Sequence, residues 1–208
     1  MWAGEQSRDT GMSNNRRTAA TGIALPFTNP FTKQESSMRT EIQGNAGLSR
    51  LCKLIAHVSA AMLTNLDGEG SLVSRPMAPL EMDRDGAIWF FTDLRSSKVE
   101  HLRVANLSFT DPSRGTYVSV SGHGEVFTER ARIDRLWTPF ARPWFPEGPD
   151  SPHLGMLRIT PATAEYWDAP HCKMVRVFAM AASVVAGKPV GQGEHGTLTD
   201  LSRTVANV

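Results

Sequence analysis

Residues Ser74–Lys98 read SRPMAPLEMDRDGAIWFFTDLRSSK, which is two apolar runs separated by a short polar stretch. The first run, Val73–Leu80, is typical of a strand, and the second, Ala87–Thr92, is typical of a strand rich in aromatic residues. Between them, Asp83–Gly86 indicates a turn, with glycine where a positive φ is needed. The pattern therefore predicts that the two strands pair as a hairpin.

Polar side chains gather at one end of this predicted hairpin. Ser97 with Glu100 fits a capping box, so a helix that begins near Lys98 would direct free backbone N–H groups outward. Together with Arg75 and Thr92, the start of this helix would present two cations, two hydroxyl groups and backbone donors. That combination is suited to binding a phosphate group.

Apolar and flat side chains adjoin the predicted phosphate site, namely those of Pro76, Met77, Phe90 and Phe91. A phosphate cradle beside a surface for a flat ring indicates a nucleotide-like cofactor, and we expect flavin mononucleotide (FMN). The same residues also fit a hairpin with an ordinary aromatic core, an exposed arginine and a solvated lysine. The sequence leaves this alternative open.

The composition is that of a soluble globular protein with nearly balanced charge. The 208 residues are 40% hydrophobic and carry 22 basic against 21 acidic side chains, for a formal net charge of +1. This balance indicates no excess of positive charge for binding nucleic acid or an anionic membrane. No apolar run approaches the roughly 18–20 residues that span a bilayer. The N-terminus lacks the apolar core of a secretory signal. Cys52 and Cys172 show no CxxC or metal-ligand spacing, so we expect a reduced, cytoplasmic setting.

The chain divides by composition into three parts. Residues 1–44 are rich in Ser, Thr, Asn, Gly and Arg without sustained periodicity, which predicts a disordered N-terminal extension. Residues 45–187 are predicted to form a single folded domain, and residues 188–208 a flexible tail. Short strands separated by turn signals, with a few helices among them, predict a mainly β (α+β) fold: a six- to seven-stranded antiparallel β-barrel with peripheral helices.

The clearest single strand is Tyr117–Phe127, in which Gly122 and Gly124 indicate a bulge or a close approach to a ligand. Apolar residues at helical spacing predict an amphipathic helix over residues 48–58 and another from Glu129. The other expected elements are a short helix over 98–104, a helix over 174–185, and strands over 59–66, 106–110, 154–160 and 164–167.

No GxGxxG, P-loop, HExxH or GxSxG motif is present, and the six histidines lack ligand-like spacing. We therefore expect no metal site, and no catalytic residue stands out. Trp137 lies on an apolar helix face, where packing is the default role. Trp144 lies in the proline-rich segment Pro143–Pro149, where nothing local should bury it, so a second subunit or a ligand ring would cover it.

Several of these segments together carry a resemblance. They are LIAHVSAAMLT (54–64), SRPM (74–77), IWFFT (88–92), SSKVEHL (96–102), YVSVSG (117–122), WTPF (137–140) and AEYWDAP (164–170). With them, the chain resembles the pyridoxamine 5′-phosphate oxidase-like FMN-binding split β-barrels, and specifically their general stress protein branch.

The resemblance implies a homodimer with two FMN sites at the interface between subunits. It implies that Arg75, Ser97 and Lys98 hold the phosphate and that Trp137 and Trp144 close the site, from the partner subunit. Under the same resemblance, the ribityl chain and the ring would be lined by Ser74, Pro76, Met77, Phe91 and Thr92.

The C-terminal segment departs from the family pattern, because it lacks the Arg/His-rich stretch with which true pyridoxamine oxidases bind the vitamin phosphate. We therefore expect an FMN-binding general stress protein that acts as a flavin-dependent oxidoreductase on another substrate, with NAD(P)H as the candidate electron donor. FAD is a second candidate cofactor. The alternative is a flavin-binding stress sensor or flavin store without turnover.

Overall fold

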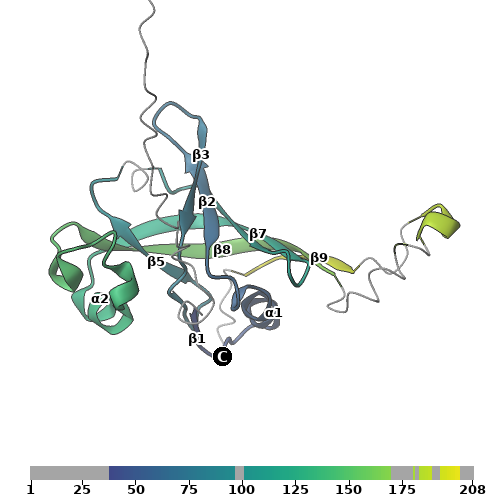
Figure 1. The fold of residues 1–208 in the computed structure, drawn as a ribbon, viewed down its shortest axis with the longest axis horizontal. Coiled ribbons are helices and arrows are strands. Elements are labelled where there is room, and N and C mark those ends of the chain that lie inside the picture. The colour runs from purple at the N-terminus through teal and green to yellow at the C-terminus, as the bar shows by residue number, and fades with distance from the viewer. Residues whose placement is uncertain (1–37, 97–100, 170–179, 181–182, 189–192, 202–208) are drawn as a thin grey trace, which may run out of the picture. The chain divides into compact units, whose positions relative to one another are not determined.

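The computed structural model describes residues 38–96, 101–169, 180, 183–188 and 193–201 (Figure 1). The helices α1 and α2 and nine strands have both ends within this part of the chain. The bounds are β1 Arg39–Thr40, α1 Ala46–Ile55, β2 Ala61–Leu66, β3 Leu72–Met77, β4 Glu81–Met82, β5 Ile88–Asp93, β6 Ala105–Asp111, β7 Thr116–Phe127, α2 Arg130–Leu136, β8 Leu154–Asp168 and β9 Glu194–Leu198, with 3₁₀ turns at Pro139–Ala141 and Gly148–Asp150.

The strands form one sheet in the order β1-β4-β5-β8-β7-β6-β2-β3, and β9 pairs with β8 off this path. Every neighbouring pair is antiparallel except β1 with β4. The predicted mainly β, antiparallel split-barrel architecture with peripheral helices is confirmed, although the strands are more numerous than the six or seven expected. No helix in the described ranges is long and apolar enough to cross a membrane.

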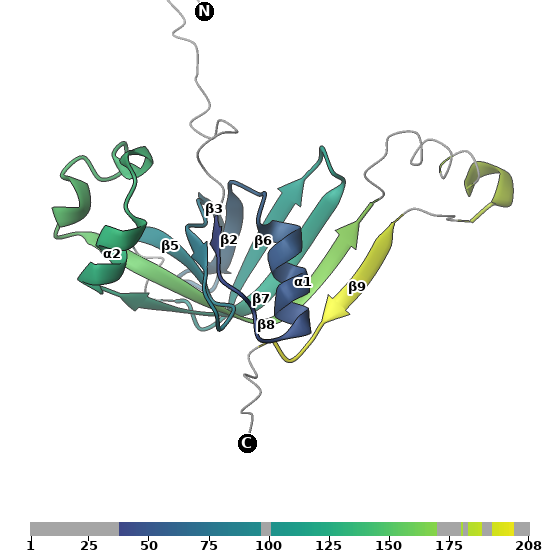
Figure 2. The same cartoon turned by 90° about the horizontal axis from the view of Figure 1, so that it is seen from below.

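The first helix forms as its sequence predicts. Asn45 caps its N-terminus, because its Oδ1 accepts hydrogen bonds from the backbone N–H groups of Gly47 (2.7 Å) and Leu48 (3.3 Å). Its apolar residues recur at helical spacing and are buried against the sheet. Figure 2 shows α1 and α2 lying against different parts of the sheet. The buried residues of α1 are Leu48, Leu51, Leu54 and Ile55.

The core consists of two clusters, one on each face of the sheet near β5 and β8. Phe90 and Leu157 belong to the large cluster that α1 covers. The adjacent residues Trp89 and Met156 belong to a smaller cluster with Ile133 and Leu136 of α2. Because side chains alternate along a strand, both faces of this part of the sheet are buried, which explains why β5 reads as a continuous apolar run.

The predicted hairpin between Val73–Leu80 and Ala87–Thr92 is wrong. The strand β3 pairs with β2, in register from Ala61 opposite Met77 to Leu66 opposite Leu72. The turn at Asp83–Gly86 does form, with φ of +83° at Gly86, but it joins β5 to the two-residue strand β4. Pro79 explains the difference, since it lacks a backbone donor and lies between the end of β3 and the start of β4.

Other elements also differ from expectation. Residues 101–104 are not helical, and the rest of the predicted helix, 98–100, lies outside the described residues. The two strands expected over 154–160 and 164–167 are a single strand, β8, whose register with β7 shifts between Ser121 and Gly122. This shift is the bulge that Gly122 predicted. Gly124 allows a close approach of the backbone near Leu102, since an added Cβ would lie 3.0 Å from the Cβ of Leu102.

Both ends of the expected domain extend further than predicted. Arg39–Thr40, in the expected extension, forms β1, and the side chain of Met38 is buried in the large cluster. Glu194–Leu198, in the expected flexible tail, forms β9, and Leu201 beyond it is buried. Most of the helix expected over 174–185 lies outside the described residues, although 183–186 are helical.

Candidate functional site

Arg75 lies on the inward row of β3, between Val73 and Met77, because every second residue of a strand faces the same side. Its guanidinium is half-buried, and Nη1 donates a hydrogen bond to Oδ1 of Asn65 at 2.9 Å. Within the described part of the chain, no carboxylate lies within ion-pair distance of Arg75. A cation is therefore held in a fixed direction with its charge uncompensated.

Thr92 lies on the inward row of β5, with Ile88 and Phe90. Its side chain is 1% exposed, and its Oγ1 has no hydrogen-bond partner among the described residues. A buried hydroxyl without a partner is costly and indicates a missing ligand atom or water. Met77, from the same row as Arg75, and Phe90 belong to one core cluster. The inward rows of β3 and β5 therefore border the same interior, although the strands do not pair.

The side chains of Ser74 and Pro76 lie on the other face of β3. The Ser74 hydroxyl is 2.7 Å from the Thr64 hydroxyl of β2, and Pro76 is exposed. Met77 is buried in the core. Of the predicted contacts on β3, only Arg75 therefore directs a polar side chain inward.

Phe91 also faces away from Thr92, into the smaller cluster beneath α2. Its ring centroid lies 5.7 Å from that of Trp137 and 6.3 Å from that of Phe145. Trp144 is 54% exposed, and its ring lies 6.0 Å from that of Phe140. Phe91 and Trp137 thus form an aromatic wall on one side of β5, and Trp144 presents a large apolar surface to solvent.

The predicted phosphate ligands Ser97 and Lys98 lie outside the described residues. The segment that precedes them ends with a turn in which Arg95 binds Asp93, through Nη2 to Oδ2 at 2.7 Å and Nε to Oδ1 at 3.0 Å. The side-chain hydrogen bond from Arg95 is the main reason that the pKa of Asp93 is lowered to about 2.

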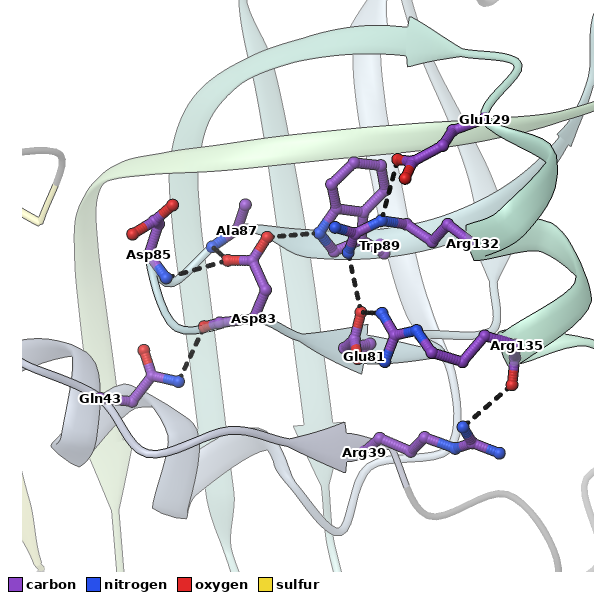
Figure 3. A network of polar contacts seen from close by, with 10 residues as sticks. All are labelled: Arg39, Gln43, Glu81, Asp83, Asp85, Ala87, Trp89, Glu129, Arg132 and Arg135. Atoms are coloured by element: carbon purple, nitrogen blue, oxygen red, sulfur yellow. Dashed lines mark hydrogen bonds and ion pairs between the residues drawn. The ribbon is translucent and has the colours of Figure 1, made fainter.

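A polar network that sequence reasoning missed attaches α2 to the sheet (Figure 3). Glu81 of β4 is buried and binds both Arg132 and Arg135 of α2. The guanidinium of Arg132 also lies over the ring of Trp89, 4.0 Å from its centroid, and Trp89 Nε1 donates to Asp83 at 2.6 Å. This network fixes the helix whose C-terminal end leads into Trp137.

A hollow of about 160 Å³ lies elsewhere, between α1 and the ends of β7 and β8. None of its lining residues is a predicted site residue, and its one carboxylate, Asp168, is already paired with Arg50. Arg50 lies 3.4 Å from Asp168 and 2.8 Å from Glu194, while Thr116 donates to Asp168 at 2.7 Å. We interpret it as a stabilising ion network rather than as a ligand site.

Asn65 is the second residue that sequence reasoning missed. It follows Ala61 and Leu63 on the inward row of β2, where an amide is unexpected. That break in the apolar alternation was the available signal, because a buried polar side chain normally has a specific partner.

Known proteins share this fold and part of the sequence. Residues 46–190 match the family model described as "Pyridoxamine 5'-phosphate oxidase like". The protein bli-3 of Neurospora crassa is 27% identical over an alignment of 169 residues, and the match covers 75% of this chain and 81% of that protein.

Two solved structures are similar at comparable identity. General stress protein 26 from Jannaschia sp. CCS1 is 28% identical, with a TM-score of 0.61, and the match covers 74% of this chain and 99% of that chain. The general stress FMN/FAD binding protein from Xanthomonas citri is 29% identical, with a TM-score of 0.50, over 59% of this chain and 87% of that chain.

Proposed function

The chain belongs to the pyridoxamine 5′-phosphate oxidase-like family, and we propose that it is a general stress protein that binds FMN with the phosphate at Arg75. The observation that carries this proposal is the half-buried guanidinium of Arg75, which is oriented by Asn65 and has no carboxylate within ion-pair distance among the described residues. The buried hydroxyl of Thr92, which has no hydrogen-bond partner among the described residues, supports it, since β5 borders the same interior as β3. The relative from Xanthomonas citri is described as binding FMN or FAD, and FAD remains a second candidate here.

The expected activity is that of a flavin-dependent oxidoreductase. When bound, the flavin would supply hydride or electron exchange, with NAD(P)H as the proposed electron donor. Arg75, Lys98 and Ser97 would hold the phosphate. The hydroxyl group of Thr92 would donate a hydrogen bond to the ligand. The wall of Phe91 and Trp137 would support the side of the site nearest α2. We further propose a cytoplasmic setting.

One observation favours the alternative, a flavin-binding sensor or store without turnover. Arg75, Asn65 and Thr92 carry the polar chemistry of the described site, and no histidine or carboxylate side chain is among them. A protein that holds flavin without acid–base chemistry needs no more than these groups. Anaerobic addition of NADPH distinguishes the two functions, because catalytic bleaching of the flavin absorbance supports the oxidoreductase and an unchanged spectrum supports the store.

We also propose a homodimer with flavin at the interface. The outward face of β2 and β3 carries apolar side chains in paired rows, with Met62 opposite Pro76 and Leu66 opposite Leu72. Leu72 is 75% exposed. Such a surface is suited to a symmetric partner. Light scattering should give twice the monomer mass, and a stable monomer that retains flavin would contradict the dimer.

The central test is the binding of FMN and riboflavin to the purified protein. FMN should bind at least tenfold more tightly than riboflavin, since only FMN carries the phosphate that a charged donor recognises. Fluorescence quenching measures both affinities. Equal affinities would contradict a phosphate site, and no binding of either would contradict a flavin protein.

A further inference from the structure

We propose that Asn65 is a positioning residue that aims the Arg75 guanidinium at an anionic ligand while leaving its positive charge available. The inference rests on the proposed function of Arg75 as the phosphate ligand. It assigns to Asn65 a role in selecting phosphorylated over unphosphorylated flavin, without requiring that Asn65 itself contact the ligand.

The orientation of the Asn65 amide is fixed by its three hydrogen bonds. The side chain is 2% exposed, and its Nδ2 donates to the backbone oxygens of Leu66 (2.8 Å) and His101 (3.2 Å). Its Oδ1 accepts from Nη1 of Arg75 at 2.9 Å. A flipped amide would place its oxygen against two carbonyl oxygens and its NH₂ group against a guanidinium. The oxygen must therefore face Arg75, which is held in one direction.

The neutrality of this partner distinguishes Arg75 from comparable arginines. Four arginines of the described residues are half-buried: Arg50, Arg75, Arg132 and Arg158. Arg50, Arg132 and Arg158 each lie within 4 Å of a carboxylate, at 2.8 Å from Glu194, 2.9 Å from Glu81 and 3.8 Å from Glu125 respectively.

Arg75 alone among these four is bound by an amide in the described structure. A carboxylate at the position of Asn65 would accept the same hydrogen bond but would also neutralise the guanidinium and repel an incoming phosphate. An amide orients Arg75 without competing with an anion. This difference is what a site for an anionic ligand requires of a supporting residue.

Asn65 also joins Arg75 to a second part of the site. The backbone oxygen of His101 accepts from Asn65, and the next backbone oxygen, that of Leu102, accepts from the N–H of Gly124 at 2.7 Å. In the sequence, this segment follows Ser97 and Lys98 after Val99 and Glu100. One amide therefore links the strand that carries Arg75 to the segment that follows the other predicted phosphate ligands.

The test compares Asn65→Asp and Asn65→Ala with the wild type, using FMN and riboflavin as separate ligands. Asn65→Asp should reduce the preference for FMN over riboflavin by at least about tenfold, with riboflavin affinity nearly unchanged. Asn65→Ala should reduce the preference for FMN less, by about three- to tenfold, because Arg75 keeps its charge and loses only its orientation. Inorganic phosphate should raise the melting temperature of the wild type without flavin, and should do so less in Asn65→Asp.

The matched control is Asn45→Asp, which makes the same chemical change at the N-cap of α1, where Asp caps as well as Asn. It should retain the wild-type preference for FMN. A folded Asn65→Asp protein with the wild-type preference would overturn the role of Asn65. If Asn65→Asp does not fold, the Asn65→Ala variant provides the test. Equal loss of FMN and riboflavin affinity in Asn65→Ala would then overturn the role of Asn65. A wild type that binds both flavins equally would overturn the phosphate site itself, which is a distinguishable result.

Discussion

Oε1 of Glu81 lies 2.6 Å from Nη1 of Arg135, and Oε2 lies 2.8 Å from Nη2 of the same guanidinium, with the glutamate side chain only 1% exposed. Oε2 also accepts from Nη1 of Arg132 at 2.9 Å (Figure 3). The hydrogen bond that Arg135 donates to Glu81 is the main reason that the pKa of Arg135 is raised. One buried carboxylate thus neutralises two cations of α2, in the two-pronged geometry that arginine favours.

Replacing Glu81 with Ala should lower the free energy of unfolding by about 2–4 kcal/mol, because two guanidinium groups lose their counter-ion beside a buried site. Urea denaturation measures the change. Asp134→Asn is the control, since its ion pair with Arg130 is exposed and should contribute less than about 1 kcal/mol. A loss for Glu81→Ala no larger than that of the control would contradict the role of the network.

The stability contributed by Asp93 should depend on pH below about 4. Its folded-state pKa is about 2 and its unfolded value is about 3.9, so the contribution is present above pH 4 and is lost as the pH falls through 2. Arg95→Gln removes the main cause, and the pKa of Asp93 should then rise toward its ordinary value. NMR titration of the carboxyl group reports this directly, and an unchanged midpoint would refute the assignment to Arg95.

Arg75→Ala should weaken FMN binding by about tenfold to a hundredfold, because a charge-assisted hydrogen bond contributes on the order of 1.5–3 kcal/mol. Riboflavin affinity should hardly change. Titrations with both flavins check this contrast, and equal weakening would place Arg75 in the scaffold instead. If FMN affinity is unchanged in both Arg75→Ala and Lys98→Ala, neither residue binds the phosphate.

Thr92→Val and Thr116→Val should differ in their effects on the stability of the protein without ligand. The Thr116 hydroxyl donates to Asp168 at 2.7 Å, so its loss should destabilise by about 1 kcal/mol. The Thr92 hydroxyl has no described partner, so its loss should be neutral or slightly stabilising, yet should weaken FMN binding severalfold. Thermal melts and FMN titrations of both variants test this. Equal destabilisation by the two changes would mean that Thr92 has a partner within the protein.

A chain that begins at Met38 should be more stable than one that begins at Glu41, by about 2–3 kcal/mol. The shorter chain loses the buried Met38 side chain and the backbone hydrogen bond from Arg39 to Leu80 (2.9 Å). It also loses the bond from Arg39 Nη1 to the Arg135 carbonyl (3.0 Å). Denaturant midpoints of the two chains give the difference, and coincident midpoints would show that β1 adds nothing.

Local features of the fold could be predicted from the sequence, while pairing between distant strands could not. The cap at Asn45, the turn at Gly86 and the bulge at Gly122 each depend on neighbouring residues and are confirmed. The choice of β2 rather than β5 as the partner of β3 could not be read from the turns alone, because a turn lies on each side of β3, at Asp67–Gly70 and at Asp83–Gly86. Likewise, β9 has few apolar residues and therefore gives little strand signal of its own, and it forms by pairing with β8.

The candidate site was predictable to a similar extent. Arg75 and Thr92 carry chemistry in their residue type, and alternation along their strands directs both inward. Asn65 and Glu81 gave only a weak signal, a polar residue among apolar neighbours. Their roles depend on partners on other elements, namely Arg75 on the adjacent strand β3 for Asn65 and Arg135, 54 residues away on α2, for Glu81.

The 15-residue strand β8 has a consequence for how the protein is made. It pairs with β5 through its first half, with β9 through its last residues and with β7 along most of its length. As the ribosome extends the chain, β5 emerges long before β8, its main pairing partner. Until β8 follows, the aromatic side chains of β5 have no complete sheet to pack in. The sheet can close only after Asp168 has left the exit tunnel, so the aromatic side chains of β5 stay exposed to aggregation until then.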